Sequence, residues 1–150
     1  LIYSITPLSN HSTICQPFQE LEIALVCREG HPRADHLNSF EEVSREGFTL
    51  YTSSDPNVKA FQQHGSDLMP ERRIAFRSNS LIAILTMINQ SDLIGFVPKH
   101  ALSYFSASFK FREIILPDPI PPVMAYMIYN RSSLNNPKFS EFITQNTAVN

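Results

Sequence analysis

The strongest constraint on the fold of this chain is a regular alternation of short apolar runs with amphipathic segments of about ten residues. The apolar runs 48–51 and 93–97 have the length and composition of strands buried in a core, and a helix-like segment follows each of them. Strands that alternate with helices of this length form sheets of parallel strands with helices packed on both faces. The pattern therefore predicts an α/β protein.

Turn and cap residues mark where the elements begin and end. Ser39 precedes two acidic residues, as the N-cap of a helix does. Pro56 suits the first position of a helix that runs towards Gly65, a plausible C-terminal stop. The expected strands are 18–26, 48–51, 74–77, 93–97, 114–116 and 123–129. The expected helices begin at Ser39, at Pro56, at Asn79 or Ser80, at Pro98, and at the pair Asn136 and Pro137.

Composition excludes several classes of protein. The formal net charge is −2, with 12 basic residues scattered among 14 acidic ones, whereas a domain that binds DNA by itself is usually basic on one face. The longest apolar stretches fall far short of the ~20 residues that span a bilayer. Cys15 and Cys27 do not make a disulfide framework, so we expect two reduced thiols. The first residues have the pattern of a strand interior, and we interpret the chain as part of a longer protein.

Polar side chains cluster where predicted strands pass into helices. In an α/β sheet these corners lie at the carboxyl edge of the strands, where ligands bind, and the helix N-termini there favour polar or anionic groups. The alternative is that the hydroxyl and amide groups only cap helices. A third corner offers backbone groups and apolar surface instead. The candidate ligand-binding residues are Thr52 and Ser53 at the first corner, Ser78, Asn79 and Ser80 at the second, and Phe96, Val97 and Pro98 at the third.

The sequence lacks the motifs of common catalytic and cofactor sites. It has no Gly-x-Ser-x-Gly pattern and no grouped glycines that could hold a phosphate. His31 and His36 follow Cys27, but a zinc site needs three or four converging ligands. We interpret both histidines as exposed loop residues. The chain is therefore expected to be no enzyme and to hold no metal or other cofactor.

Two further groups have a structural and a functional interpretation. Arg72 and Arg73 precede a predicted strand, and we interpret them as a solvated pair rather than as an anion clamp. Phe105, Phe109 and Phe111 are interpreted as core or interface residues, because no basic cluster surrounds them as in a platform for stacking nucleic-acid bases.

Several segments, in order, resemble the LysR family of transcriptional regulators. The segment LEIALVCREGHP at 21–32 resembles a strand and turn of that family. The segment NSLIAILTMINQSDLIGFVP at 79–98 resembles its capped helix and buried strand without a gap. Residues 116–117, 124–130 and 139–143 resemble its closing segments. The segment CREG at 27–30 and the pair SD at 91–92 most resemble a little-characterised enterobacterial subgroup of that family. Where the family has Gly-Leu-Gly, this chain has Ser91, Asp92 and Leu93, so the local turn must differ.

The resemblance implies a fold of the periplasmic-binding-protein type 2, in which two α/β lobes are joined by two crossover strands. Residues 27–122 would form a complete second lobe. Residues 1–26 and 123–150 would form part of the first lobe together with the crossover strands. The family's DNA-binding winged helix-turn-helix would be absent from this chain.

The resemblance also implies a function. A small polar or anionic effector would bind between the lobes, at the three corners named above, and control transcription. The expected partners are this effector, further copies of the chain in a dimer or tetramer, and DNA only through the absent domain; no membrane contact and a cytoplasmic location are expected. Two alternatives stay open: a periplasmic solute-binding protein of similar fold, and an oligomerisation module without a ligand.

Overall fold

The computed structural model describes residues 2–4, 7, 10–54 and 56–146. The chain divides into two compact units. Unit 1 comprises Leu1–Leu21 and Pro122–Asn150, and unit 2 comprises Glu22–Pro121. The assignment of these units to the lobes expected from the sequence, with limits at 26/27 and 122/123, stays a prediction.

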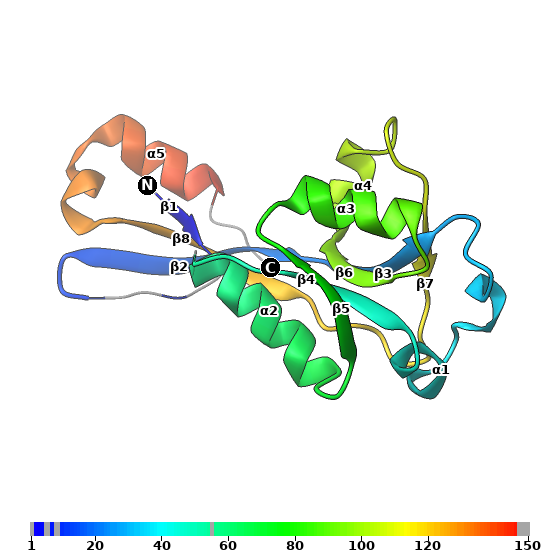
Figure 1. The fold of residues 1–150 in the computed structure, drawn as a ribbon. Coiled ribbons are helices and arrows are strands. Elements are labelled where there is room, and N and C mark those ends of the chain that lie inside the picture. Colours follow the sequence, from blue (N-terminus) through cyan, green and yellow to red (C-terminus); the bar gives the residue numbers. More distant parts are fainter. Residues whose placement is uncertain (1, 5–6, 8–9, 55, 147–150) are drawn as a thin grey trace. The chain divides into compact units, whose positions relative to one another are not determined.

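Unit 1 is a three-stranded antiparallel sheet covered by a helix (Figure 1). Its strand order is β1-β8-β2. Tyr129 of β8 contacts the ring of Phe139, and Met127 and Ile143 join Tyr129 in a small buried core. Its elements are β1 (Ile2–Ser4), β2 (Thr13–Leu21), β8 (Val123–Asn130), the 3-10 helix η2 (Arg131–Asn135) and α5 (Pro137–Asn146).

Unit 2 contains a mixed sheet with helices on both faces (Figure 1). Its strands are β3 (Ile23–Arg28), β4 (Gly47–Tyr51), β5 (Arg73–Ser78), β6 (Gly95–Pro98) and β7 (Phe111–Ile114). Its helices are the 3-10 helix η1 (Ala34–His36), α1 (Phe40–Ser44), α2 (Pro56–Leu68), α3 (Leu81–Gln90) and α4 (Lys99–Tyr104). None of the helices in the described part of the chain is long and apolar enough to cross a membrane.

The strands of unit 2 run in the order β5-β4-β6-β3-β7. β4 and β5 are parallel, and a parallel bridge between Phe48 and Ile94 joins β4 to the start of β6. Ile94 accepts a hydrogen bond from Thr49 (2.9 Å) and donates one to Gly47 (3.0 Å). The expected parallel arrangement is thus right for these strands. It is wrong for β3, which is antiparallel to both β6 and β7, because strand direction depends on long-range pairing that local periodicity does not encode.

The central strand β3 supplies side chains to two cores. Leu25 and Cys27 point to the face covered by α1 and α2, where they join Phe48. Ala24 and Val26 point to the face covered by α3. All four are at most 1% exposed, as expected for a strand with both faces covered.

Some element limits differ from those expected. α2 does not stop at Gly65, because the carbonyl of Gly65 accepts a hydrogen bond from Met69 and the helix continues to Leu68. The single strand expected over 18–26 is divided at Glu22 into β2 and β3. The strand expected over 114–116 ends at Ile114, because β7 is defined by its pairing with β3 rather than by its own apolar residues.

Candidate functional site

The two polar corners lie side by side in unit 2. Tyr51, the last residue of β4, is in register with Ser78, the last residue of β5. One residue further on, the backbone N–H of Thr52 donates a hydrogen bond of 2.7 Å to the carbonyl oxygen of Ser78. The parallel pairing therefore brings Thr52 and Ser53 next to Ser78, Asn79 and Ser80 at one edge of the sheet.

Part of the second corner is occupied with capping α3. The hydroxyl of Ser80 accepts a hydrogen bond from the N–H of Ala83 (3.2 Å), so Ser80, and not Asn79, is the N-cap. The hydroxyl of Ser78 accepts from the N–H of Ser80 (3.1 Å). These two hydroxyls hold the corner in shape.

Other groups at this edge remain available. The hydroxyl of Thr52 and the side-chain amide of Asn79 make no hydrogen bond with any residue that the structure describes. Asn79 is exposed, while Thr52 and Ser53 are half-buried. The first N–H groups of a helix have no partner within it, and the N-terminus of α3 adds the positive end of its dipole. The edge therefore combines a hydroxyl, an amide and backbone donors.

The third corner contributes mainly backbone. Val97 is fully buried in the core beneath α3. Phe96 packs on the opposite face, with its ring centroid 5.9 Å from that of Phe48. Pro98 pairs with Ile23 at the end of β6. Ile94 and Phe48 pair in a parallel bridge, and Val97 and Tyr51 each lie three residues after them. Both strands therefore end at the same edge of the sheet.

None of these eight residues carries an ionisable side chain, so none of them offers a carboxylate or an imidazole for acid–base catalysis. In the described ranges, no three His, Cys, Asp or Glu side chains come together as metal ligands. The free thiol of Cys27 is buried, and this burial raises its pKa, so it stays protonated at neutral pH.

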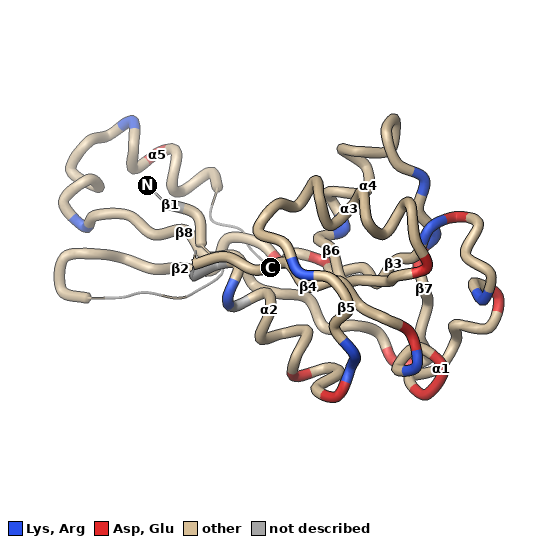
Figure 2. Tube along the Cα trace, viewed as in Figure 1, with Lys and Arg blue, Asp and Glu red and all other residues tan. Residues whose placement is uncertain are grey.

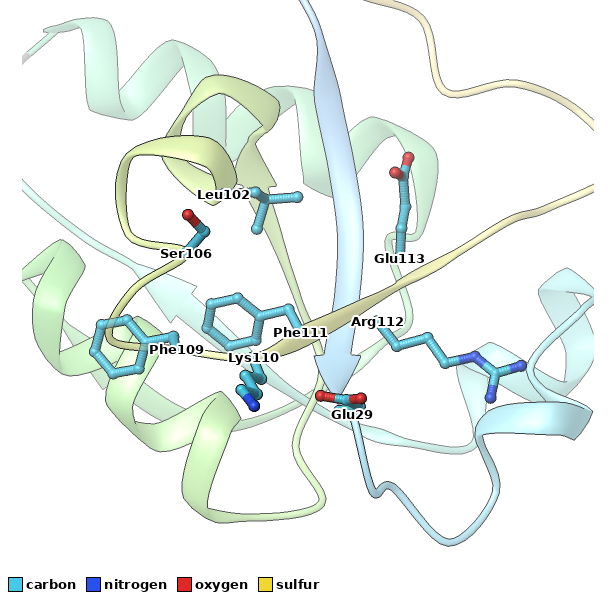
Figure 3. A pocket seen from close by; sticks show the side chains of 8 residues that line it. All are labelled: Glu29, Leu102, Ser106, Phe109, Lys110, Phe111, Arg112 and Glu113. Carbon is cyan, nitrogen blue, oxygen red and sulfur yellow. The ribbon is translucent and has the colours of Figure 1, made fainter.

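A separate hollow of about 640 Å³ lies between α4 and the edge strand β7 (Figure 3). The rings of Phe109 and Phe111 stack in its wall at a centroid distance of 5.7 Å, and with Phe105 they pack against the core, as expected. Two of its charged side chains already have partners, since Arg112 pairs with Asp35 at 2.8 Å and Glu113 lies 3.8 Å from Lys99. The lining residues are Glu29, Leu102, Ser106, Phe109, Lys110, Phe111, Arg112 and Glu113.

His31 is not the exposed loop residue that we expected. Its side chain is fully buried, its Nδ1 accepts from the N–H of Arg33 (3.0 Å), and its Nε2 lies 2.8 Å from the carbonyl oxygen of Asp92. Because Nδ1 accepts, Nε2 carries the proton and donates to that carbonyl. The ring thus connects the turn after β3 to the Ser91-Asp92 turn before β6.

Charged side chains surround this histidine. Glu46 binds Arg33 through two hydrogen bonds of 2.7 Å. These bonds hold the pKa of the Glu46 carboxyl below its ordinary value although burial opposes the shift. The Arg28 side chain, at 2.8 Å, likewise lowers the pKa of Asp92. Figure 2 shows basic and acidic residues interspersed around α1 and the neighbouring turns.

The two arginines expected to form a solvated pair differ from each other. Arg73 is exposed, but Arg72 is partly buried, and its Cζ lies 5.9 Å from the ring centroids of both Phe48 and Phe96. The expectation was therefore wrong for Arg72. The apolar rings that cover it come from β4 and β6, so no local sequence signal marks its environment.

Comparison with known proteins gives a consistent result. Residues 1–148 match the family described as LysR substrate binding domain. The chain is 34% identical over 143 residues to the uncharacterised HTH-type transcriptional regulator YbdO of Escherichia coli K12, covering 95% of this chain and 48% of that protein. The regulator YbeF of the same organism, which represents the subgroup expected from the sequence, is 24% identical over 77% of this chain and 37% of its own length. The expected likeness to YbeF is therefore weaker than that to YbdO, and the chain spans about half or less of these relatives.

Solved structures show the same fold at low identity. The regulatory domain of Synechocystis PCC6803 CcmR in complex with 2-PG superposes with a TM-score of 0.72, at 15% identity, over 98% of this chain and 73% of that one. The probable regulator PA0477 of Pseudomonas aeruginosa gives a TM-score of 0.71, at 15% identity, over 95% of this chain and 47% of that one. The expected fold of the periplasmic-binding-protein type 2 is confirmed.

Proposed function

This chain belongs to the LysR substrate binding domain family, the effector-binding part of LysR-type transcriptional regulators, and from this premise we propose that it binds a small polar or anionic molecule at the carboxyl edge of β4 and β5. The molecule would be held by the Thr52 hydroxyl, the Asn79 amide and the N-terminal N–H groups of α3.

One observation carries this proposal. The hydrogen bond of 2.7 Å from Thr52 to Ser78 joins the two corners directly, and the neighbouring hydroxyl of Thr52 and amide of Asn79 have no partner among the described residues. Side chains that served only to cap the helix would accept hydrogen bonds from the backbone, as those of Ser78 and Ser80 do. A carboxylate or a phosphate ester is the class of ligand that suits a helix N-terminus flanked by neutral donors.

The wider role is also a proposal. We infer that the chain acts within a longer cytoplasmic regulator, in which a DNA-binding part lies outside these residues and copies associate as a dimer or tetramer. The regulatory domain of CcmR, which has the same fold, is in complex with 2-PG in its solved structure, so this fold can accept a small molecule. Placement of the ligand between two lobes stays a prediction, as does the assignment of Phe96, Val97 and Pro98 to the site. The function is binding rather than catalysis.

A ligand screen with matched variants tests the site. The purified chain is heated with a library of small carboxylates, phosphate esters and neutral polar metabolites. A true ligand raises Tm in proportion to ln(1 + [L]/Kd). We expect Thr52→Val and Asn79→Ala each to weaken binding of the same ligand by about 10- to 150-fold, equivalent to one lost hydrogen bond to a charged group.

The controls separate binding from stability. Thr86→Val, at a half-buried position in the second turn of α3, and Asn38→Ala, at an exposed position before α1, change the same side-chain types outside the two corners, and they are expected to leave Kd unchanged. Equal losses in the control variants, or ligands that bind Thr52→Val and Asn79→Ala as tightly as the unaltered chain, would place the site elsewhere.

A further inference from the structure

Arg72 occupies an unusual position under α2. Its guanidinium packs against the rings of Phe48 and Phe96, with 5.9 Å from Cζ to each ring centroid. Its Nη1 donates to the carbonyl oxygen of Met69 at 3.1 Å, just beyond the C-terminus of α2. This carbonyl is the one protein acceptor for Arg72 among the residues that the structure describes.

The positive charge of Arg72 has no counterion in the described part of unit 2. No carboxylate oxygen of a described residue lies within 4.0 Å of it, and its Nε is buried without a hydrogen-bond partner. Burial also lowers the pKa of the guanidinium, although the group remains charged at neutral pH. A buried donor and an uncompensated charge are both costly, so an acceptor that carries negative charge would stabilise this arrangement.

A small cavity lies beside the guanidinium. Its accessible volume is about 20 Å³, enough for a single water-sized occupant. The side-chain amide of Gln62 lies in the wall and donates one hydrogen bond to the carbonyl oxygen of Tyr51. The second N–H of the Gln62 amide has no acceptor among the described residues. The lining residues are Thr49, Leu50, Tyr51, Phe61, Gln62, Gly65, Arg72 and Phe96.

Gly65 keeps this space open. A Cβ at position 65 would lie 3.3 Å from Cδ2 of Phe96 and 3.4 Å from Nη2 of Arg72. Glycine in the interior of a helix is less stable than alanine, so its presence in the middle of α2 has no advantage for the helix itself. It does leave room next to the guanidinium.

We propose that Arg72 and this cavity bind one small monatomic anion, with chloride as the physiological candidate. A volume of about 20 Å³ suits a monatomic ion better than a carboxylate or a phosphate group, which need room for several heavy atoms. A water molecule would satisfy Nε but would leave the charge uncompensated. Neither Thr52 nor Asn79 lines the cavity, and the test below uses no effector.

Thermal unfolding of the purified chain tests this proposal. Sodium chloride is exchanged for sodium gluconate at constant ionic strength, which keeps screening equal. Chloride is expected to raise Tm by about 3–5 °C once it exceeds its Kd about tenfold, and above the Kd the rise should grow with the logarithm of the chloride concentration. Arg72→Gln should abolish the dependence, whereas Arg77→Gln, which changes an exposed arginine of β5, the strand that follows Arg72, should keep it.

Two further measurements cover the case in which Arg72→Gln does not fold. Gly65→Ala places a methyl group in the cavity and should remove the chloride dependence while the helix is retained. Crystals soaked in bromide should show an anomalous peak within about 3.5 Å of Nε, a contact distance for this larger anion. A chloride response shared by Arg72→Gln and Arg77→Gln, or a water at Nε with no bromide peak, would overturn the proposal.

Discussion

At the scale of single residues, Glu46 shows how a buried charge is tolerated in unit 2. Its side chain is 6% exposed and receives two hydrogen bonds from Arg33, while His31 Nε2 lies 3.2 Å from its Oε1. These contacts connect the turn after β3 to the end of α1. Local sequence gives no sign of them, because Arg33 and Glu46 are separated by a 3-10 helix and α1.

We expect Glu46→Gln to destabilise the chain by about 1–3 kcal/mol at pH 7, because a buried group loses charge-assisted bonds. The pKa of Glu46 is lower in the folded chain than in the unfolded chain. Its contribution is therefore present above the unfolded value of about 4.3 and is lost as the pH falls through the lower folded value. Denaturant unfolding should show the two proteins converging in stability below about pH 4.

Glu41→Gln is the matched control for this experiment. Glu41 pairs with Arg45 at 2.8 Å, but both side chains are more than half exposed. Such a pair contributes at most about 0.5 kcal/mol on a helix surface. A loss for Glu41→Gln as large as that for Glu46→Gln would show that burial is not the cause.

Gly95 is a second residue at which the structure makes a definite prediction. A Cβ at this position would overlap with Oγ1 of Thr49 on the neighbouring strand and lie 3.1 Å from Cδ1 of Ile88. We expect Gly95→Ala to cost about 1–3 kcal/mol through overpacking, measured by thermal unfolding. Gly30→Ala meets only the end of the flexible Arg28 side chain, and it should change stability by less than half as much.

At the scale of elements, the cap of α3 can be separated from ligand binding. Ser80→Ala removes the acceptor for the N–H of Ala83 and should destabilise unit 2 by about 1 kcal/mol. Ser103→Ala, at an exposed position within α4, should have little effect on the unfolding midpoint. If both substitutions cost the same, the hydroxyl of Ser80 does not stabilise α3.

The elements also show which parts of the fold local sequence can predict. Caps and prolines located the starts of α1, α2, α3 and α5, because Ser39, Pro56, Ser80 and Asn136 act within one turn of themselves. The direction of β3 and the limits of β7 depend on partners far along the chain, so periodicity did not predict them. At the site, the pairing of the first two corners follows from parallel strands, whereas the covering of Arg72 by two rings does not.

At the scale of the molecule, β3 is the central and most deeply buried strand of unit 2. It is paired on both sides, and its residues 23–27 are at most 7% exposed. Amides of such a strand exchange only when the surrounding structure opens. The backbone amides of Ala24, Leu25 and Val26 should therefore exchange more slowly than those of β5, which among the described strands pairs with β4 alone. Faster exchange in β3 than in β5 would contradict this ranking.

The pairing of β3 has a consequence for the order in which the chain can fold during synthesis. Leu25 is translated well before its partners Phe96 and Ile114, and contacts of such long sequence separation form slowly. Unit 1 waits longer still, because β2 pairs with β8 near the other end of the chain. A nascent chain that stalls before Phe111 therefore leaves one edge of β3 unpaired, and such an edge can pair with another chain.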